Sequence, residues 1–324
     1  MVVETALRLK FNLVIPASFL NIDNPCEKAL ADAVARRGIY ISQHHIEPLG
    51  VSSFTFENYL KKFGKIGKYS YTENPELFDE IWRYYAREWA KYDNVVWQIG
   101  IRGIGDRPIW QEADPTEEEL KGYGALISSI YEKQKQIVLD ATNGKSRYFT
   151  STLWMEGAAL MSRGYLSLPE DVITVFADTG PSQTYCKDFH SYRFKADEAY
   201  GIYYHLQYYG CGPHLVPETG LDKLYYHVRL AYDKGCRAYF IMNASNIREF
   251  VFELTAYSKM TRGISSYSNE KYLDEYCRAF GEQAEELRGL VSRYFDELPA
   301  LDISVLQWQH ANYFHYNMER LPSP

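Results

Sequence analysis

The sequence predicts an α/β fold of the TIM (β/α)8-barrel type, without its first strand, followed by an all-α helical segment. Two observations predict it: seven short apolar runs alternate with helical stretches, and no Gly-rich phosphate loop follows the first run. A chain of 324 residues has room for a barrel of roughly 250 residues and a smaller appendage. We expect the catalytic barrel over residues 1–262 and a helical bundle segment over residues 263–324.

The predicted strands are runs that are apolar on both faces, which is typical of parallel strands buried on both sides. They are Asn12–Pro16, Gly38–Ser42, Val95–Ile101, Arg147–Trp154, Val172–Ala177, Ala199–Tyr204 and Cys236–Met242. No eighth run is visible, and the chain begins in a helical stretch. We therefore expect the first barrel strand to lie upstream of Met1.

The predicted helices start at capping residues and stop at glycine or asparagine-glycine pairs. They are Glu27–Arg37 after Asn24-Pro25, a helix from Pro75 through Tyr92, a helix from Thr116 to Thr142, and a stretch from Gly220 to Gly235. Beyond Arg262 the pattern becomes wholly helical. We expect one long helix over Glu270–Leu298, with apolar residues at helical spacing, and a second over Leu301–Glu319.

Composition narrows the class of protein. Hydrophobic residues make up 46% and charged residues 24%, an ordinary soluble balance, and the net charge of -7 argues against a nucleic-acid partner, which needs a basic patch. No apolar run reaches the ~18 residues of a membrane span. The five cysteines are odd in number without a Cys-x-x-Cys pair, which fits reduced thiols. With no signal peptide at Met1, we expect a cytoplasmic chain as it stands, and a homodimer stays open.

Polar clusters follow five of the predicted strands, where parallel barrels carry their functional groups. The clusters hold His44, His45 and Glu47; Arg102 and Asp106; Asp178; Tyr204 and His205; and Asn243. Cleavage of a glycosidic bond needs two carboxyl groups, one to protonate the leaving oxygen and one to activate water or attack the sugar. We therefore predict Asp178, Asp106 and Glu47 as catalytic. Arg102 beside them would suit an acidic sugar.

Several of these residues have a structural alternative. Asp178 could equally cap the following helix, and Asn243 could bond its own loop. Adjacent strand residues point to opposite faces, so we expect at most one of His44 and His45 at the mouth and no metal pair. Among the 29 tyrosines, core packing is the favoured role for any single residue, with stacking on sugars as the alternative.

At these clusters the sequence resembles glycoside hydrolase family 115, the xylan α-1,2-glucuronidases. The resemblance covers nearly the whole chain in order and spacing. It is carried by Leu7-Arg-Leu-Lys-Phe-Asn, His44-His45-Ile-Glu47-Pro48, Tyr71-Thr-Glu-Asn-Pro-Glu, Ile99-Gly-Ile-Arg102-Gly103-Ile-Gly105-Asp106, Pro169-Glu-Asp-Val-Ile-Thr-Val-Phe-Ala-Asp178, Gly201-Ile-Tyr203-Tyr204-His205, Leu230-Ala-Tyr-Asp and Asn243.

The resemblance implies inverting removal of (4-O-methyl)glucuronic acid side chains from glucuronoxylan, with no cofactor and no metal. By position it implies that Asp178 and Asn243 lie in the sugar pocket. It implies the substrate-binding set His44, His45, Arg102, Tyr204, His205 and Asn243, with Glu47 and Asp106 also lining the pocket. The expected partner is an oligosaccharide or polysaccharide.

Three departures from the family pattern support a competing hypothesis. The family usually has Asp-Asp-Asn at Asp178-Thr179-Gly180, Arg-Gly-Asp-Gly-Asp-Glu at Arg102–Arg107, and Asn-Val-Gly-Asp at Asn243–Asn246. Acidic groups are thus lost at three strand ends. The alternative is a catalytically inactive or divergent carbohydrate-binding barrel. A third hypothesis is a metal-dependent hydrolase that uses His44 or His45 with Asp178.

Overall fold

The computed structural model describes residues 1–16, 18–110, 114–180, 182–208, 217, 219–244 and 246–297. These residues form two compact units. The first unit contains residues 1–176 and 187–200, and the second contains residues 177–186 and those from 201 onward. The predicted boundary at residue 262 stays a prediction.

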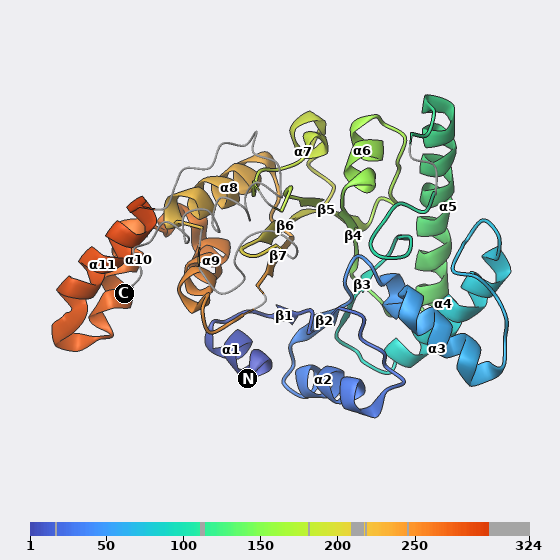
Figure 1. The fold of residues 1–324 in the computed structure, drawn as a ribbon, viewed down its shortest axis with the longest axis horizontal. Coiled ribbons are helices and arrows are strands. Elements are labelled where there is room, and N and C mark those ends of the chain that lie inside the picture. Colours follow the sequence, from blue (N-terminus) through green and yellow to red (C-terminus); the bar gives the residue numbers. More distant parts are fainter. Residues whose placement is uncertain are drawn as a thin grey trace, which may run out of the picture. The chain divides into compact units, whose positions relative to one another are not determined.

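The described residues form seven parallel strands in the order β1-β2-β3-β4-β5-β6-β7 (Figure 1). They are β1 (Leu13–Val14), β2 (Tyr40–Ser42), β3 (Val95–Gln98), β4 (Phe149–Leu153), β5 (Val172–Ala177), β6 (Tyr200–His205) and β7 (Tyr239–Asn243). Each of the seven predicted runs overlaps one of them, and β6 and β7 each extend one residue beyond their run. The prediction of an α/β fold with a parallel sheet is therefore confirmed.

The helices alternate with these strands. In the first unit they are α1 (Val2–Arg8), α2 (Pro25–Ala35), the 3-10 turn η1 (Pro48–Gly50), α3 (Ser53–Phe63), α4 (Pro75–Trp89), α5 (Glu117–Ala141), α6 (Glu156–Ser162) and α7 (Lys187–Ser191). In the second unit they are α8 (Leu221–Lys234), α9 (Val251–Gly263), η2 (Ile264–Ser266), α10 (Asn269–Arg278), η3 (Gly281–Gln283) and α11 (Ala284–Glu297).

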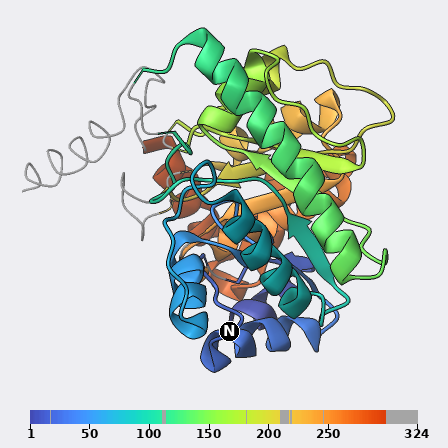
Figure 2. The same cartoon turned by 90° about the vertical axis from the view of Figure 1, so that its right-hand side faces the viewer.

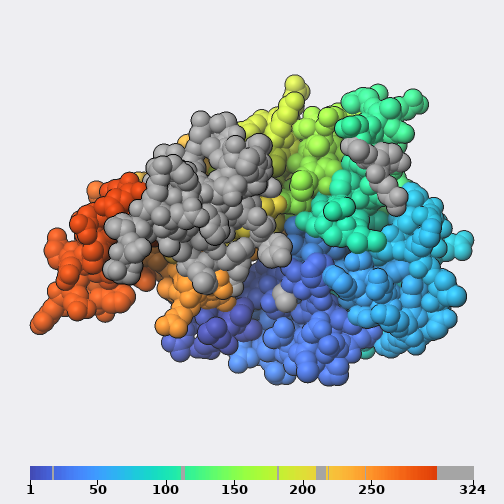
Figure 3. Space-filling view, in the orientation of Figure 1, coloured from blue at the N-terminus to red at the C-terminus, as the bar shows by residue number. Residues whose placement is uncertain are grey.

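α4 begins at Pro75 as predicted, without a side-chain cap at Asn74, and capping contacts confirm two other predicted helix starts in the first unit. The Asn24 side chain accepts the Cys26 N–H, and Pro25 occupies the first turn of α2. Thr116 and Glu119 form a capping box at the start of α5, in which each side chain bonds the other's backbone N–H. The long α5 packs against α4, as Figures 1 and 2 show. The segment that holds α3 and α4 forms the light-blue surface of Figure 3.

The core of the first unit is aromatic. β3 and β5 are buried along their whole length, as expected for strands covered on both faces. Trp82 and Trp89 of α4 and Trp97 of β3 are almost fully buried. Core packing is thus the main use of these large rings.

The second unit corrects one helix prediction. Glu270–Leu298 is not one helix: α10 ends at Arg278 and α11 begins at Ala284, with η3 between them. Gly281 lies in η3 with φ +64°, a left-handed conformation that interrupts an α-helix and that glycine adopts most readily. The apolar spacing of the sequence did not reveal this break.

Two other expectations concern the predicted C-terminal helix and membrane-spanning helices. The predicted helix over Leu301–Glu319 lies outside the described residues. Among the helices that the structure describes, none is long and apolar enough to cross a membrane.

Candidate functional site

Arg102 lies at the centre of a polar cluster in the first unit. Its Nε donates to Asp106 Oδ1 at 2.8 Å, and one terminal nitrogen, Nη2, donates to the Asp106 carbonyl at 2.5 Å. The other, Nη1, forms an ion pair with Glu156 and contacts the Trp154 carbonyl at 3.4 Å. The guanidinium therefore bridges two carboxylates and is almost fully buried, with 7% of its side chain exposed.

The loop after β3 turns back on itself, and this turn places Asp106 next to Arg102. Gly103 N–H donates to the Arg107 carbonyl at 2.8 Å and closes a tight turn. Inside the turn, Gly105 and Asp106 both have positive φ, 68° and 60°, which is uncommon for a residue other than glycine. This turn brings the side chain of Asp106 back to that of Arg102.

The two carboxyl groups on Arg102 differ in their tendency to hold a proton. Burial acts to raise the pKa of Asp106, but the hydrogen bond and charge of His45, together with Arg102, hold it below its usual value. Burial raises the pKa of Glu156, and the charge of Arg102 opposes that rise only in part. The surroundings thus lower the proton affinity of Asp106 and raise that of Glu156.

The two histidines lie beside this cluster, and their arrangement corrects the expectation of opposite faces. The ring centroids of His44 and His45 are 4.1 Å apart. Both residues follow the end of β2 at Ser42, so the alternation of a strand no longer applies to them. His45 Nε2 lies 3.3 Å from Asp106 Oδ1, which links the histidine turn to the Arg102 cluster.

Glu47 is buried in the same turn, with 1% exposure. Its Oε1 accepts the His44 N–H at 3.3 Å, and the nearby backbone of Leu20 and Phe19 acts to lower its pKa. Burial has the larger effect and raises the pKa of Glu47 to about 8. Its known contacts join two loops, which is a positioning role.

A second cluster lies within the second unit, around Asp178 at the end of β5. Asp178 is fully buried. Its Oδ1 accepts the Gly180 N–H at 2.9 Å and contacts His205 Nδ1 at 2.5 Å, while Oδ2 accepts the His205 N–H at 2.9 Å. Both carboxylate oxygens are therefore occupied by the protein. This arrangement fixes the orientation of the His205 ring.

Asn243 and the tyrosines of β6 complete this cluster. The Asn243 amide donates to the hydroxyl of Tyr203 at 3.1 Å, and the rings of Tyr203 and His205 lie 4.3 Å apart. Tyr204 points to the other face of β6, where its ring lies 5.7 Å from that of His227 on α8. Of the predicted β6 pair, His205 therefore joins Asn243 and Asp178, and Tyr204 packs toward a helix.

Sequence reasoning missed Glu156 and Tyr203. Glu156 follows the end of β4 by three residues, so the rule that barrels carry functional groups at the carboxyl ends of strands could have found it. Tyr203 stood inside a quoted motif, and its alternation with Tyr204 along the strand was the available signal.

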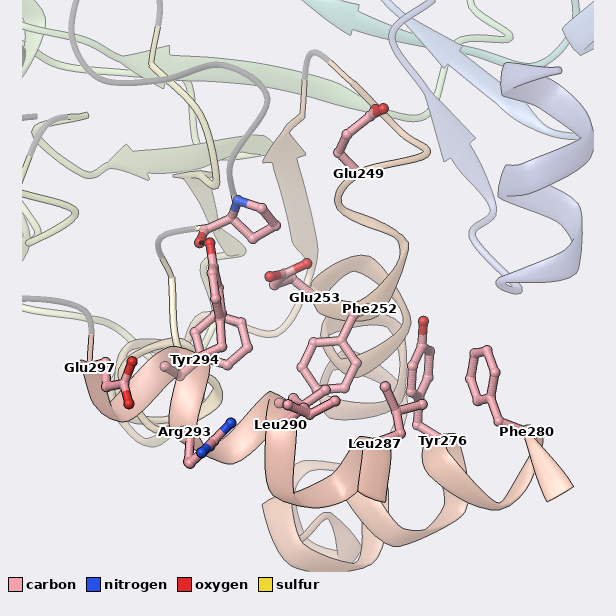
Figure 4. A pocket seen from close by; sticks show the side chains of 13 residues that line it. Glu249, Phe252, Glu253, Tyr276, Phe280, Leu287, Leu290, Arg293, Tyr294 and Glu297 are labelled. Carbon is pink, nitrogen blue, oxygen red and sulfur yellow. Dashed lines mark hydrogen bonds between the residues drawn. The ribbon is translucent and has the colours of Figure 1, made fainter. Parts of the chain in front are cut away.

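Neither cluster contains a recognisable metal site. Within the part of the chain that the structure describes, no three His, Cys, Asp or Glu side chains are grouped so that they could hold a metal ion. Separately, a cavity of about 660 Å³ lies in the second unit between α9, α10 and α11 (Figure 4). Phe252, Tyr276 and Leu290 form part of its wall and Glu253 also lines it. None of the predicted site residues does.

Comparison with known proteins gives a family and a fold. The family model described as glycosyl hydrolase family 115 matches residues 1–300. Among solved structures, the chain is similar to BtGH115A, described as a family GH115 4-O-methyl-alpha-glucuronidase with specificity for decorated arabinogalactans, with a TM-score of 0.74 and 19% identity. The match covers 91% of this chain and 38% of that one. No curated protein is significantly similar in sequence.

Proposed function

Because this chain belongs to glycosyl hydrolase family 115, we propose that it carries catalytic groups of a glycoside hydrolase. The proposed reaction removes (4-O-methyl)glucuronic acid side chains from a polysaccharide. The observation that best supports this proposal is the bridge that Arg102 forms between Asp106 and Glu156.

The opposite pKa directions of these two carboxyl groups divide the roles between them. Glu156, whose pKa is raised by burial, is the proposed general acid that protonates the leaving oxygen. Asp106, whose pKa is lowered despite burial by His45 and Arg102, is the proposed base that activates water. Environments that separate two carboxyl pKa values in this way are how one site supplies an acid and a base together.

Arg102 has a further role in the proposal, because all three of its nitrogens already bond the protein. A substrate carboxylate would compete with Glu156 for Nη1. Loss of its cationic partner would raise the Glu156 pKa further and favour its acidic form when substrate is bound.

Two details follow from the family resemblance: hydrolysis of an α-1,2 linkage and inversion at the anomeric carbon. Inversion is checked by NMR of the first-formed product, which should be the β-anomer of glucuronic acid. An α-anomer would contradict it. In an inverting site the two carboxyl groups should lie about 6.5–9.5 Å apart with water between them. A closed eight-stranded barrel is likewise a proposal, supported by the seven parallel strands in chain order.

The test of function replaces each carboxyl group by its amide. Glu156→Gln and Asp106→Asn should each lower release of glucuronic acid from aldouronic acids or glucuronoxylan by at least about 100-fold, the usual contribution of a general acid or base. Glu117→Gln is the matched control, because Glu117 is exposed with 58% of its side chain accessible. Unchanged turnover in both test variants would remove the assignment.

A carbohydrate-binding barrel without activity is the second candidate, and the environment of Gly180 favours it. A Cβ at Gly180 would lie 2.4 Å from the Tyr208 ring, so that ring fills the space where the family usually has an asparagine side chain. Calorimetry with glucuronoxylan distinguishes the two candidates: binding without any released sugar supports the second, and turnover excludes it.

A further inference from the structure

Two exposed phenylalanines lie together in the first unit. Phe19 is 41% exposed and Phe54 is 56% exposed. Their ring centroids are 5.0 Å apart with the planes at 87°. In an edge-to-face pair the edge of one ring covers part of one face of the other, and the remaining faces are not covered by the partner ring. About half of each of the two side chains stays exposed to solvent.

The backbone of Phe19 gives one reason to treat its exposure as functional. Its φ is +62°, a conformation that bulky residues rarely adopt and that is retained where surrounding contacts enforce it. The backbone of Phe19 and Leu20 lies close to the buried carboxyl group of Glu47. Phe19 thus combines a strained backbone beside a buried group with a ring that is 41% exposed.

Phe54 is held outward by independent contacts. Ser52 and Thr55 form a capping box that fixes the first turn of α3. Thr55, Phe56 and Tyr59 are the buried residues of that helix, so Phe54 lies on the opposite side. Both rings are therefore fixed in position rather than left on a loose loop.

The pair is linked to the Arg102 cluster by a chain of contacts. Glu47, whose carboxyl group lies close to the Phe19 backbone, accepts the His44 N–H. His44 packs on His45, and His45 reaches Asp106. Phe19 lies in the loop after β1, and Phe54 lies in the first turn of α3, in the connection that follows β2. The connections after the carboxyl ends of strands are where a barrel carries its ligands.

We propose that Phe19 and Phe54 form a sugar-stacking platform that binds neutral pyranose rings of the polysaccharide main chain, adjoining the groups that act on the side chain. Flat aromatic faces suit the C–H-rich faces of pyranoses, whereas an uncharged pair offers nothing to the uronic acid carboxylate. This inference rests on the proposed function for its substrate class, and Glu47 serves it as a positioning residue.

The test is affinity electrophoresis of the full chain through gels that contain polysaccharide, which needs no bond cleavage. Phe54→Ala and Phe19→Gly should each weaken retardation by debranched xylan about five- to tenfold, the loss of one stacking contact. Phe54→Tyr keeps an aromatic ring at this position and should be retarded as strongly as the unaltered chain. Phe63→Ala, at the far end of α3 and 45% exposed, is the control and should bind as the unaltered chain does.

Phe19→Gly also separates a binding role from a structural one. Glycine adopts positive φ without strain, so this variant should unfold at the same or a higher temperature while binding less. A marked fall in unfolding temperature, or retardation equal to that of Phe63→Ala, would overturn the proposal. A gel with a galactan main chain in place of xylan shows which pyranose the platform prefers. Platform binding without sugar release would support the platform and count against hydrolysis.

Discussion

At the residue scale, three carboxyl groups that looked equivalent in the sequence have different environments. Both oxygens of Asp178 accept hydrogen bonds from the second unit. Glu47 bonds backbone groups and its pKa is raised to about 8 by burial. Only Asp106, with 35% of its side chain exposed and a cation beside it, is both charged and accessible. Accessibility therefore favours Asp106 as the reacting group and assigns Asp178 to positioning His205.

Asp178→Asn should destabilise the protein. Two of the three groups bonded to Asp178 are backbone N–H donors, and an amide NH2 turned toward them cannot accept. One buried donor left unbonded costs about 1–3 kcal/mol. Thermal unfolding should therefore occur several degrees lower. Asp171→Asn is the control: its side chain is 59% exposed in a surface ion pair, and such pairs contribute little. Equal shifts in the two variants would contradict this role.

A residue of the site could be predicted from the sequence where its place at or near the end of a strand brings it to the site. Asp178 directly follows β5, His205 and Asn243 end β6 and β7, and Asp106 lies in the loop after β3. The apolar runs of the sequence mark these strands. The partnership between Arg102 and Glu156 was not predictable, because it joins the loop after β3 to the start of α6, 54 positions apart in the sequence. The side-by-side histidines were missed for a related reason: β2 ends two residues before His44.

At the element scale, the strands were predictable because burial on both faces demands continuous apolar runs. The helix starts were predictable because Asn24 and Thr116 are capping residues with readable neighbours. The break between α10 and α11 was not, since its apolar spacing continues through Phe280 and Ala284. A single glycine with positive φ, Gly281, decides it, and a glycine alone does not reveal its φ in the sequence.

Gly201→Ala should strongly destabilise β6. A Cβ there would lie 2.3 Å from the Tyr239 carbonyl oxygen, and β6 and β7 are paired at this register. The clash involves backbone, which cannot move aside without breaking the pairing. We expect a loss of more than about 2 kcal/mol, as for an overpacked core site, measured by urea unfolding.

Gly122→Ala is the matched control for that substitution. Gly122 lies inside α5 with nothing within 4 Å of its Cβ position. Alanine at an open helical site stabilises by roughly 0.5–1 kcal/mol. The free energy of unfolding should therefore fall in Gly201→Ala and rise in Gly122→Ala. Stabilisation by Gly201→Ala would show that the strands can separate at this point.

At the scale of the whole molecule, buried acids in both units connect the fold to pH. Burial raises the pKa of Asp188 to about 6, of Glu253 to about 7 and of Glu47 to about 8. No hydrogen bond within the described residues reaches either carboxylate oxygen of Asp188 or Glu253. Folding thus places these groups in surroundings that favour their neutral forms.

The sign of the resulting pH dependence follows from proton counts. Above about pH 4 the unfolded chain has released the protons of these three groups, whereas the folded chain keeps them up to about pH 6 on Asp188, pH 7 on Glu253 and pH 8 on Glu47. The free energy of unfolding must therefore fall as pH rises through this window. Groups with lowered pKa values, such as Asp106, act mainly below about pH 4 and do not offset the fall.

Urea unfolding at pH 5 and pH 8 measures this dependence. The urea concentration at the midpoint should be higher at pH 5 than at pH 8. The free energy of unfolding should differ by about a few kcal/mol between the two pH values when the three groups act together. Glu253→Gln removes one ionisable group in place, so its stability should vary less between the two pH values and should exceed that of the unaltered chain at pH 8. Glu275→Gln, on the exposed side of α10 with 65% of its side chain accessible, should leave the difference unchanged. A midpoint that rises from pH 5 to pH 8 would mean that these carboxyl groups are charged in the folded protein, and that the interior of at least one unit admits water or a cation to them.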